Sequence, residues 1–73
     1  MKFKFTNHAQ YRMHTREIST IDIKDIIDNP DFTEIQNNGK ILKVKYIPNK
    51  GKTAVVYKQI GSEFIIITIY YED

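Results

Sequence analysis

The run FIIITIYY, residues 64–71, is apolar on both of the faces that a β-strand presents. One face would carry Phe64, Ile66, Thr68 and Tyr70, and the other Ile65, Ile67, Ile69 and Tyr71. A strand with one solvent-facing side alternates apolar with polar residues, whereas a strand covered on both sides is almost continuously apolar. We therefore expect residues 64–71 to form an inner strand of a sheet.

Three other strand-like runs precede this strand: FTEIQ (32–36), ILKVKYI (41–47) and TAVVYKQI (53–60). They are rich in β-branched and aromatic residues, and short polar segments that contain glycine separate them. Asn38 and Gly39 both tolerate the positive φ angles of a type I′ hairpin turn. Together these runs predict an antiparallel meander of three to four strands.

The alternation within residues 41–47 predicts which side of the meander is covered. Leu42, Val44 and Tyr46 are expected to face the helices, because they form the apolar set of this strand. Lys43 and Lys45 are then expected to face outward, where they could meet solvent or an anionic partner.

The N-terminal residues predict a short strand and a helix. KFKF (2–5) alternates lysine with phenylalanine, which is typical of a strand with Phe3 and Phe5 on one side. A helix is predicted over residues 8–16, because Thr6 or Asn7 can cap its first turn.

A second helix is predicted to begin at Ser19. Ser19 can act as its N-cap, with Asp22 in place of the glutamate of a capping box. Pro30 ends this helix, because a residue that precedes proline is pushed out of the helical region. The order of elements predicts an α+β fold, with a short N-terminal strand and two helices packed on one face of a curved antiparallel meander.

The composition is that of one small globular domain spanning residues 1–73. Hydrophobic residues make up 41% and charged residues 27% of the chain, which is ordinary globular usage. The sequence has no cysteine and two histidines, so we expect neither a disulfide, a metal site nor a cofactor. The longest apolar run is too short to span a bilayer and no signal peptide is apparent, which predicts a cytoplasmic protein without membrane contact. The oligomeric state stays open.

Charge is unevenly distributed along the chain, although the net charge is only +2. Residues 40–58 contain six lysines and no acid, whereas residues 17–34 contain six acids and one lysine. A basic side of this kind is typical of proteins with a polyanionic partner such as RNA. Lysines that only keep the outer face of a sheet soluble would give the same pattern.

The stretch HAQYRMHTRE, residues 8–17, carries the candidate chemistry. At 100° per residue His8, Arg12 and Arg16 share one stripe of a helix, and Ala9 and Met13 lie directly beside it. The side chains of this stripe are therefore expected to face the groove between helix and sheet. Arginine forks match phosphate oxygens, and the positive end of the helix dipole favours a neutral His8, which can accept a proton.

These groups suit the transesterification of RNA, in which a 2′-hydroxyl attacks its own phosphodiester. The protein needs only a base, an acid and cations for the charge that grows on the phosphate. We expect His8, Arg12 and Tyr70 to be catalytic. The residues expected to bind RNA are Arg16, Lys43, Lys45, Tyr46 and Lys58.

Other interpretations remain open from the residues alone. Arg12 could pair with Glu34, Glu72 or Asp73 while its stem covers apolar surface. The chain could also be a non-enzymatic nucleic-acid-binding module, or an adaptor that docks a partner protein through its acidic second helix and an edge strand.

Residues 5–19, FTNHAQYRMHTREIS, together with the acidic helix, the NP pair and a meander that ends in TIY, resemble a small bacterial family of unknown function, numbered 4258. Its members look like His-Ala-x-x-Arg-Met, then Arg-Gly-Ile-Ser, then a helix that ends near Asn-Pro. One residue departs from this pattern, because Glu17 stands where the family usually has glycine.

That family is similar to the RelE-like toxins and to the wider group of metal-independent ribonucleases that includes barnase and EndoU. The resemblance implies two helices on a curved antiparallel sheet, RNA as substrate and an antitoxin protein as partner. It implies active-site roles for His8 and Arg12. Supporting roles would fall to Arg16, Tyr46, Lys58 and Tyr70.

Overall fold

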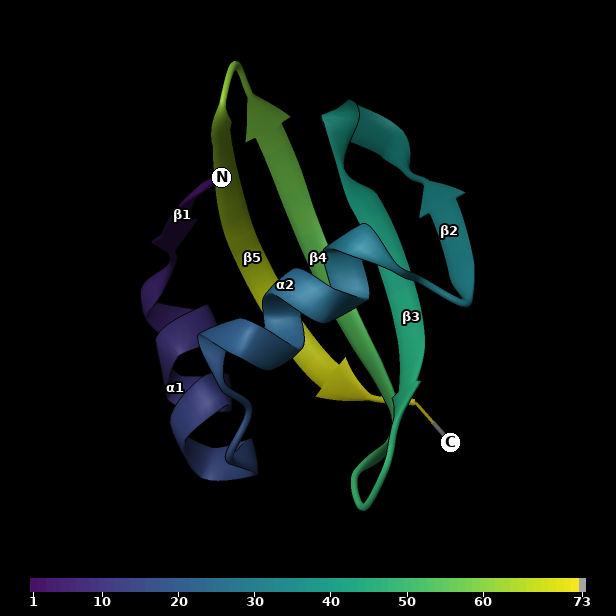
Figure 1. The fold of residues 1–73 in the computed structure, drawn as a ribbon. Coiled ribbons are helices and arrows are strands. Elements are labelled where there is room, and N and C mark those ends of the chain that lie inside the picture. Colours follow the sequence, from purple (N-terminus) through teal and green to yellow (C-terminus); the bar gives the residue numbers. More distant parts are fainter. Residues whose placement is uncertain (73) are drawn as a thin grey trace.

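The computed structural model describes residues 1–72, which form a five-stranded sheet with two helices on one face (Figure 1). The elements are β1 (Lys2–Phe5), α1 (Asn7–Arg16), α2 (Thr20–Asp28), β2 (Phe32–Ile35), a 3-10 turn (Asn37–Gly39), β3 (Ile41–Ile47), β4 (Gly51–Ile60) and β5 (Glu63–Tyr71). This architecture confirms the predicted α+β class. Within these residues no helix is long and apolar enough to cross a membrane.

The strand order in the sheet is β1-β5-β4-β3-β2. Strands β2 to β5 form the predicted antiparallel meander, and β5 is an inner strand, as its apolar run predicts. Strand β1 adds to the far side of β5 in parallel, which makes the sheet mixed. Phe3 packs edge-on against Phe64, with 5.9 Å between the ring centroids, so the lysine–phenylalanine alternation anchors β1 to β5.

A β-bulge in β5 changes which residues share a face. Val56 pairs with Thr68 but Tyr57 pairs with Ile66, so Ile67 is an extra residue in β5. Residues after the bulge therefore change sides relative to a regular strand. Ile69 and Tyr71, rather than Thr68 and Tyr70, continue the helix-covered face of Phe64 and Ile66. The prediction of regular alternation through residues 64–71 is wrong at this point.

The bulge is also where the start of α1 is attached. The Thr6 backbone N–H donates to the Ile66 carbonyl at 3.1 Å, and the Thr6 hydroxyl donates to the Ile67 carbonyl at 2.8 Å. The same hydroxyl accepts the Ala9 N–H at 3.0 Å, which makes Thr6 the N-cap of α1. One side chain therefore both begins the helix and holds it on β5.

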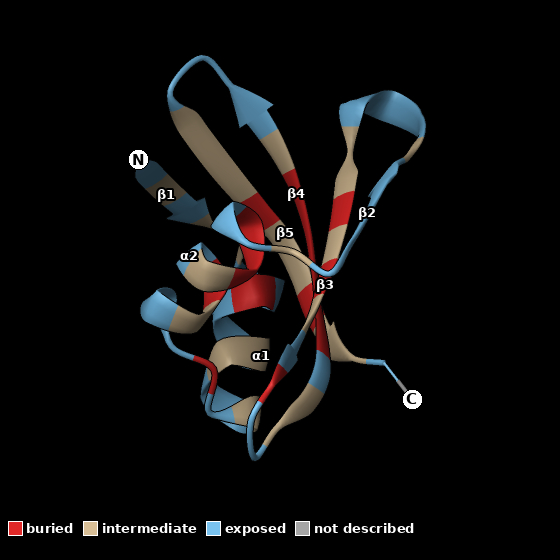
Figure 2. Cartoon of the chain, turned by 45° about the vertical axis from the view of Figure 1, so that its right-hand side comes forward, coloured by how far each residue is buried: buried red, intermediate tan, exposed pale blue. Residues whose placement is uncertain are grey.

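Each face of the sheet has its own apolar cluster. Figure 2 shows buried residues in α2 and in strands β3, β4 and β5. The helix-covered cluster contains Ile23, Ile26 and Ile27 of α2 with sheet residues such as Val55. The other side, here called the open face, carries a second cluster on which no helix packs within residues 1–72. Its members are Leu42, Val44, Ala54 and Val56, with Tyr70 packed against them.

The predicted orientation of residues 41–47 is therefore reversed. Leu42 and Val44 lie on the open face, where Tyr46 is 60% exposed. Lys43 and Lys45 lie on the helix-covered face instead. The prediction was wrong because both faces of the sheet carry apolar clusters. Hydrophobicity alone therefore does not identify the face that the helices cover.

Lys43 and Lys45 donate hydrogen bonds to backbone carbonyls at the C-terminal end of α2. The Lys43 ammonium donates to the Ile27 carbonyl at 2.7 Å and lies 5.7 Å from the centre of the Tyr57 ring. The Lys45 ammonium donates to the Asn29 carbonyl at 2.9 Å. Helix α2 has no basic residue in its last turn, so these two lysines supply the positive charge that its free carbonyls and dipole favour.

We predict that Lys43→Met lowers the free energy of unfolding by about 1.5 kcal/mol, because the Ile27 carbonyl loses a charged donor. Urea denaturation measures the change. Lys52→Met, which alters an exposed lysine of β4, is the matched control and is expected to change it by less than about 0.5 kcal/mol. Equal losses in the two variants would contradict this role of Lys43.

Helix α1 ends at a residue with left-handed backbone geometry. Glu17 has a φ of 54°, and the following Ile18 N–H donates back to the Met13 carbonyl at 3.0 Å. Ile18 itself is buried, so the turn directs it into the core. A side chain at such a φ is strained, which explains in physical terms why glycine would be favoured at position 17.

We predict that Glu17→Gly raises the free energy of unfolding by about 1 kcal/mol, because it relieves this strain. Thermal or urea denaturation measures the gain. Glu17→Ala removes the same carboxylate but keeps the Cβ atom, so it should bring no comparable gain. An equal gain in the alanine variant would show that charge, rather than backbone geometry, is responsible.

Candidate functional site

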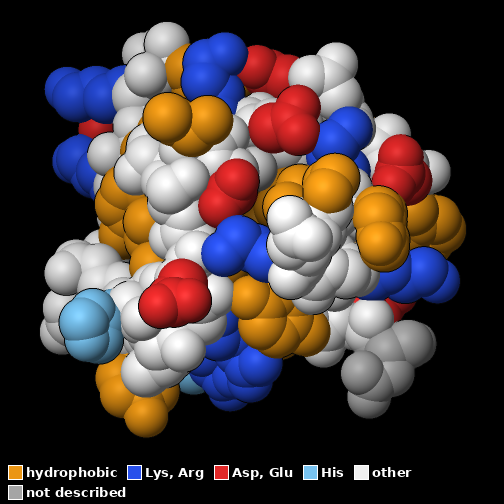
Figure 3. Space-filling view, turned by 60° about the horizontal axis from the view of Figure 1, so that its bottom comes forward, with side chains coloured by type: hydrophobic (Ala, Val, Ile, Leu, Met, Phe, Trp, Pro, Cys, Tyr) orange, Lys and Arg blue, Asp and Glu red, His pale blue; other side chains and the backbone are white. Residues whose placement is uncertain are grey.

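Both arginines of the sequence, Arg12 and Arg16, line one solvent-open pocket of about 650 Å³, here called the arginine pocket. Its lining residues are Tyr11, Arg12, Thr15, Arg16, Glu17 and Tyr71. It lies between the C-terminal half of α1 and the end of β5. Figure 3 looks toward this end of the molecule and shows Lys and Arg side chains grouped at its lower edge, beside hydrophobic side chains.

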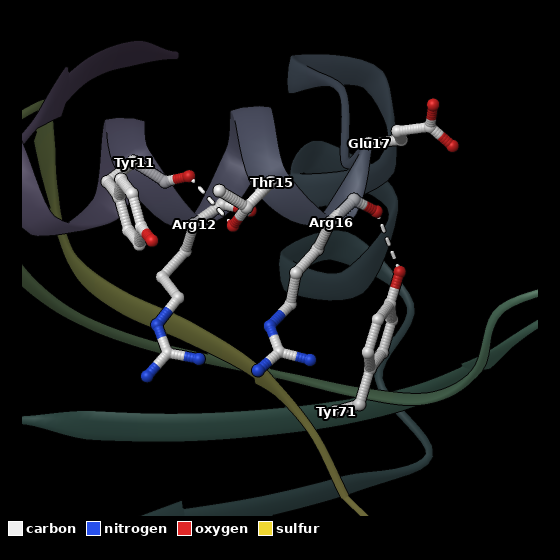
Figure 4. Close-up of a pocket in the computed structure, with 6 residues that line it drawn as sticks. All are labelled: Tyr11, Arg12, Thr15, Arg16, Glu17 and Tyr71. Carbon is white, nitrogen blue, oxygen red and sulfur yellow. Dashed lines mark hydrogen bonds between the residues drawn. The ribbon is translucent and has the colours of Figure 1, made fainter.

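Helix geometry explains how α1 supplies most of this pocket. Residues four apart lie on one row of a helix, so Tyr11 and Thr15 form one row and Arg12 and Arg16 the next. The two guanidinium groups extend side by side from the helix in Figure 4. The Thr15 hydroxyl donates to the Tyr11 carbonyl at 3.0 Å, so its proton is directed at the helix backbone rather than into the pocket.

Tyr71 holds the end of α1 and orients Arg16. Its hydroxyl donates to the Arg16 carbonyl at 2.7 Å, and the Arg16 guanidinium carbon lies 5.1 Å from the centre of its ring. A cation over an aromatic ring is attracted to the ring electrons. One tyrosine therefore fixes the backbone and the charged group of the same residue, and it reaches this face because of the bulge at Ile67.

The two guanidinium groups have no carboxylate partner within the part of the chain that the structure describes. Neither forms an ion pair at 4.0 Å or less, so the expected alternative pairing of Arg12 with Glu34 or Glu72 is not seen. Asp73, the third candidate partner, lies outside the described residues. Arg12 Nε is buried and has no hydrogen-bond partner among residues 1–72. The Glu17 carboxylate points away from both guanidinium groups in Figure 4.

This arrangement is chemically suited to an anion with several oxygen atoms. Each guanidinium presents donors in a planar fork that matches phosphate geometry. The buried, unpaired Nε–H of Arg12 adds a reason for a ligand, because a buried donor without a partner is costly. The arginine pocket is therefore a candidate phosphate-binding site.

His8 lies on the same row of α1 as the arginines but does not line their pocket. It is in the first turn of the helix and is exposed. The expected cleft is therefore formed by Arg12 and Arg16, while the imidazole stands one helical turn beyond Arg12. In residues 1–72 no group of three or more potential metal-ligating side chains is found.

Tyr70 does not share the arginine pocket, because the bulge places it against the open-face cluster. Burial, with smaller contributions from Glu72 and Glu34, raises the pKa of the Tyr70 phenol above its usual value. Its hydroxyl therefore stays protonated at neutral pH and is a poor base.

The remaining predicted RNA-binding residues are scattered over both faces. Tyr46 lies on the open face, beside a smaller pocket of about 320 Å³ that Lys52 and Glu72 also line. Lys58 continues the open-face alternation of Ala54 and Val56 along β4. Lys43 and Lys45 lie on the helix-covered face, where their ammonium groups bond the backbone at the end of α2.

Sequence reasoning missed Tyr11 and Tyr71 as members of the site. The helix pattern carried a signal for Tyr11, because it directly precedes Arg12 and lies four residues before Thr15. No pattern in the sequence placed Tyr71, since its side depends on the bulge.

Comparison with known proteins identifies the family. Residues 5–71 match a family described as Domain of unknown function (DUF4258), so the match includes α1, α2 and almost all of the sheet. Searches of the curated proteins and of the solved structures gave no match. Since the match spans nearly the whole sequence, the chain belongs to the DUF4258 family.

Proposed function

We propose that this protein binds RNA through the arginine pocket and cleaves it as a metal-independent endoribonuclease of toxin type. The observation that carries the proposal is the pairing of two guanidinium groups in one open pocket, with no carboxylate bound to either within residues 1–72. Guanidinium groups that have no carboxylate partner inside the protein are suited to bind an external anion. A backbone phosphate of RNA supplies that anion.

The proposed reaction uses the substrate's own nucleophile. His8 takes the proton of the 2′-hydroxyl, whose oxygen then attacks the adjacent phosphorus. The bond from phosphorus to the 5′-oxygen breaks, a 2′,3′-cyclic phosphate remains, and the leaving oxygen takes up a proton from water or from the protonated His8. Arg12 and Arg16 stabilise the charge that grows on the phosphate oxygens.

The position of His8 supports this role in part. His8 is exposed and lies one helical turn, about 5.4 Å along the axis, before Arg12, so RNA that extends from the pocket toward the start of α1 would pass it. Tyr70, on the opposite face of the sheet, has no part in the proposed reaction. Tyr46 and Lys58 are also remote from the arginines and are not needed for it.

The toxin-type assignment rests on the similarity of the DUF4258 family, to which the α1 motif belongs, to RelE-like and barnase-type ribonucleases. The order of strand, two helices and meander agrees with that resemblance. A toxin of this class would act on RNA in the cytoplasm and would be neutralised by an antitoxin protein.

A second candidate is an RNA-binding module without catalysis. It is favoured by one specific observation, namely that His8 does not line the arginine pocket. The two candidates share the phosphate site and differ only in whether the bound RNA is cut.

We predict that the purified protein cleaves RNA in the presence of EDTA, and that His8→Ala reduces the rate by about 10²- to 10⁴-fold with little change in binding. Arg12→Ala and Arg16→Ala should each weaken binding. They should also flatten the dependence of log affinity on log salt by about 0.7 for each RNA phosphate that the variant no longer neutralises. Gel analysis of labelled RNA and fluorescence anisotropy give the two measurements.

Two matched controls separate these effects from general changes in charge. His14→Ala removes the other exposed histidine of α1, and Lys52→Ala removes an exposed cation of the sheet. Both should behave like the native protein. Binding without cleavage would favour the non-catalytic module. An RNA affinity that neither Arg12→Ala nor Arg16→Ala changes would overturn the proposed site.

A further inference from the structure

We infer that Tyr11 is a stacking platform for a nucleobase and that it gives the arginine pocket a preference for single-stranded RNA over an RNA duplex. The inference rests on the proposed function and adds the substrate class to it. It depends on a difference between the two tyrosines of the pocket. The Arg16 guanidinium lies over the Tyr71 ring, whereas no aromatic ring or cation of the described residues lies over the Tyr11 ring.

Tyr11 is an exposed aromatic residue at the arginine pocket. The residue is 65% exposed, and it lines the same pocket as both arginines. Figure 4 shows its ring descending from α1 on the same side as the Arg12 side chain. A base attached to a phosphate at Arg12 would therefore find an aromatic surface immediately beside it.

The second tyrosine of the pocket is already engaged. The Tyr71 ring faces the Arg16 guanidinium, and its hydroxyl bonds the Arg16 carbonyl. No aromatic ring or cation stacks on Tyr11 among the described residues. Tyr11 is thus the pocket tyrosine whose ring is free for a ligand.

Other exposed apolar side chains lack this combination. Ile21, Ile35 and Ile60 are exposed but have no part in the arginine pocket. Tyr46 is exposed on the open face, where its small pocket contains acidic Asp31 and Glu72 beside Lys52. Only at Tyr11 do an exposed ring and two unpaired guanidinium groups occur together within residues 1–72.

Stacking on Tyr11 requires an unpaired base. In a duplex each base is covered by its neighbours and hydrogen-bonded to its partner, so its ring is not free to leave the stack without cost. A single strand offers both a phosphate for the arginines and a base for the tyrosine. This combination of a cationic track and an aromatic platform is general among proteins that bind single strands.

The test measures the affinity of native and variant proteins for a labelled single-stranded oligouridine and for an RNA duplex of equal length, in EDTA and with the His8→Ala change present to prevent cleavage. Tyr11→Ala should weaken binding of the single strand by about 5- to 150-fold and leave duplex binding unchanged. Tyr11→Phe, which keeps the ring, should retain native affinity. Circular dichroism and thermal melting of both variants verify folding.

Arg16→Ala in the same series distinguishes this inference from the proposed function. If Arg16→Ala weakens RNA binding but Tyr11→Ala does not, the stacking role is overturned and the phosphate site stands. A Tyr11→Ala loss that is equal for single strand and duplex also overturns the inference. If neither variant weakens binding, the proposed function fails and the inference fails with it.

Discussion

The hydrogen bond from the Tyr71 hydroxyl to the Arg16 carbonyl is the contact on which the rest of the site depends. The last carbonyls of a helix have no partner within the helix, and here β5 supplies one of them at 2.7 Å. The same ring lies beneath the Arg16 guanidinium. A strand and a helix more than fifty residues apart in the chain are thereby joined at the residue that carries the charge.

Helix α1 is held on β5 at both of its ends. Thr6 bonds the bulged segment at the start of the helix, and Tyr71 bonds the carbonyl at its end. Between these anchors Ala9 is completely buried and Met13 packs against the core. Because Arg12 and Arg16 lie on the row beside those residues, the two charges stand at the margin of the buried face rather than in it. Two cations can therefore line the helix–sheet junction in a domain that has few core residues to spare.

Much of the fold was predictable because its signals are local. Ser19 and Asp22 form the capping box that their spacing predicts, with bonds of 3.1 Å in each direction. Asn38 and Gly39 take the positive φ angles of 63° and 74° expected between β2 and β3. Each of these features depends on a few neighbouring residues, so the sequence carries them directly.

The features that sequence reasoning missed depend on contacts between distant residues. The bulge at Ile67 exchanged the predicted sides of Tyr70 and Tyr71, and it left only the second of them beside the arginines. Because both faces of the sheet carry apolar clusters, the sequence did not indicate which face α2 covers. Lys43 and Lys45 were therefore predicted to face outward. Helical spacing is sufficient to bring Arg12 and Arg16 into one pocket, but it does not bring His8 into that pocket.

The most direct measurement of the central claim uses the fact that Arg12 and Arg16 are the only arginines in the sequence. A ¹⁵N-labelled sample then has two side-chain Nε–H signals, which can be followed by NMR while a short single-stranded RNA is added. The account predicts that both signals shift together and saturate at the same RNA concentration. Signals that stay in place, while backbone signals of open-face residues such as Tyr46 and Lys58 move, would contradict it.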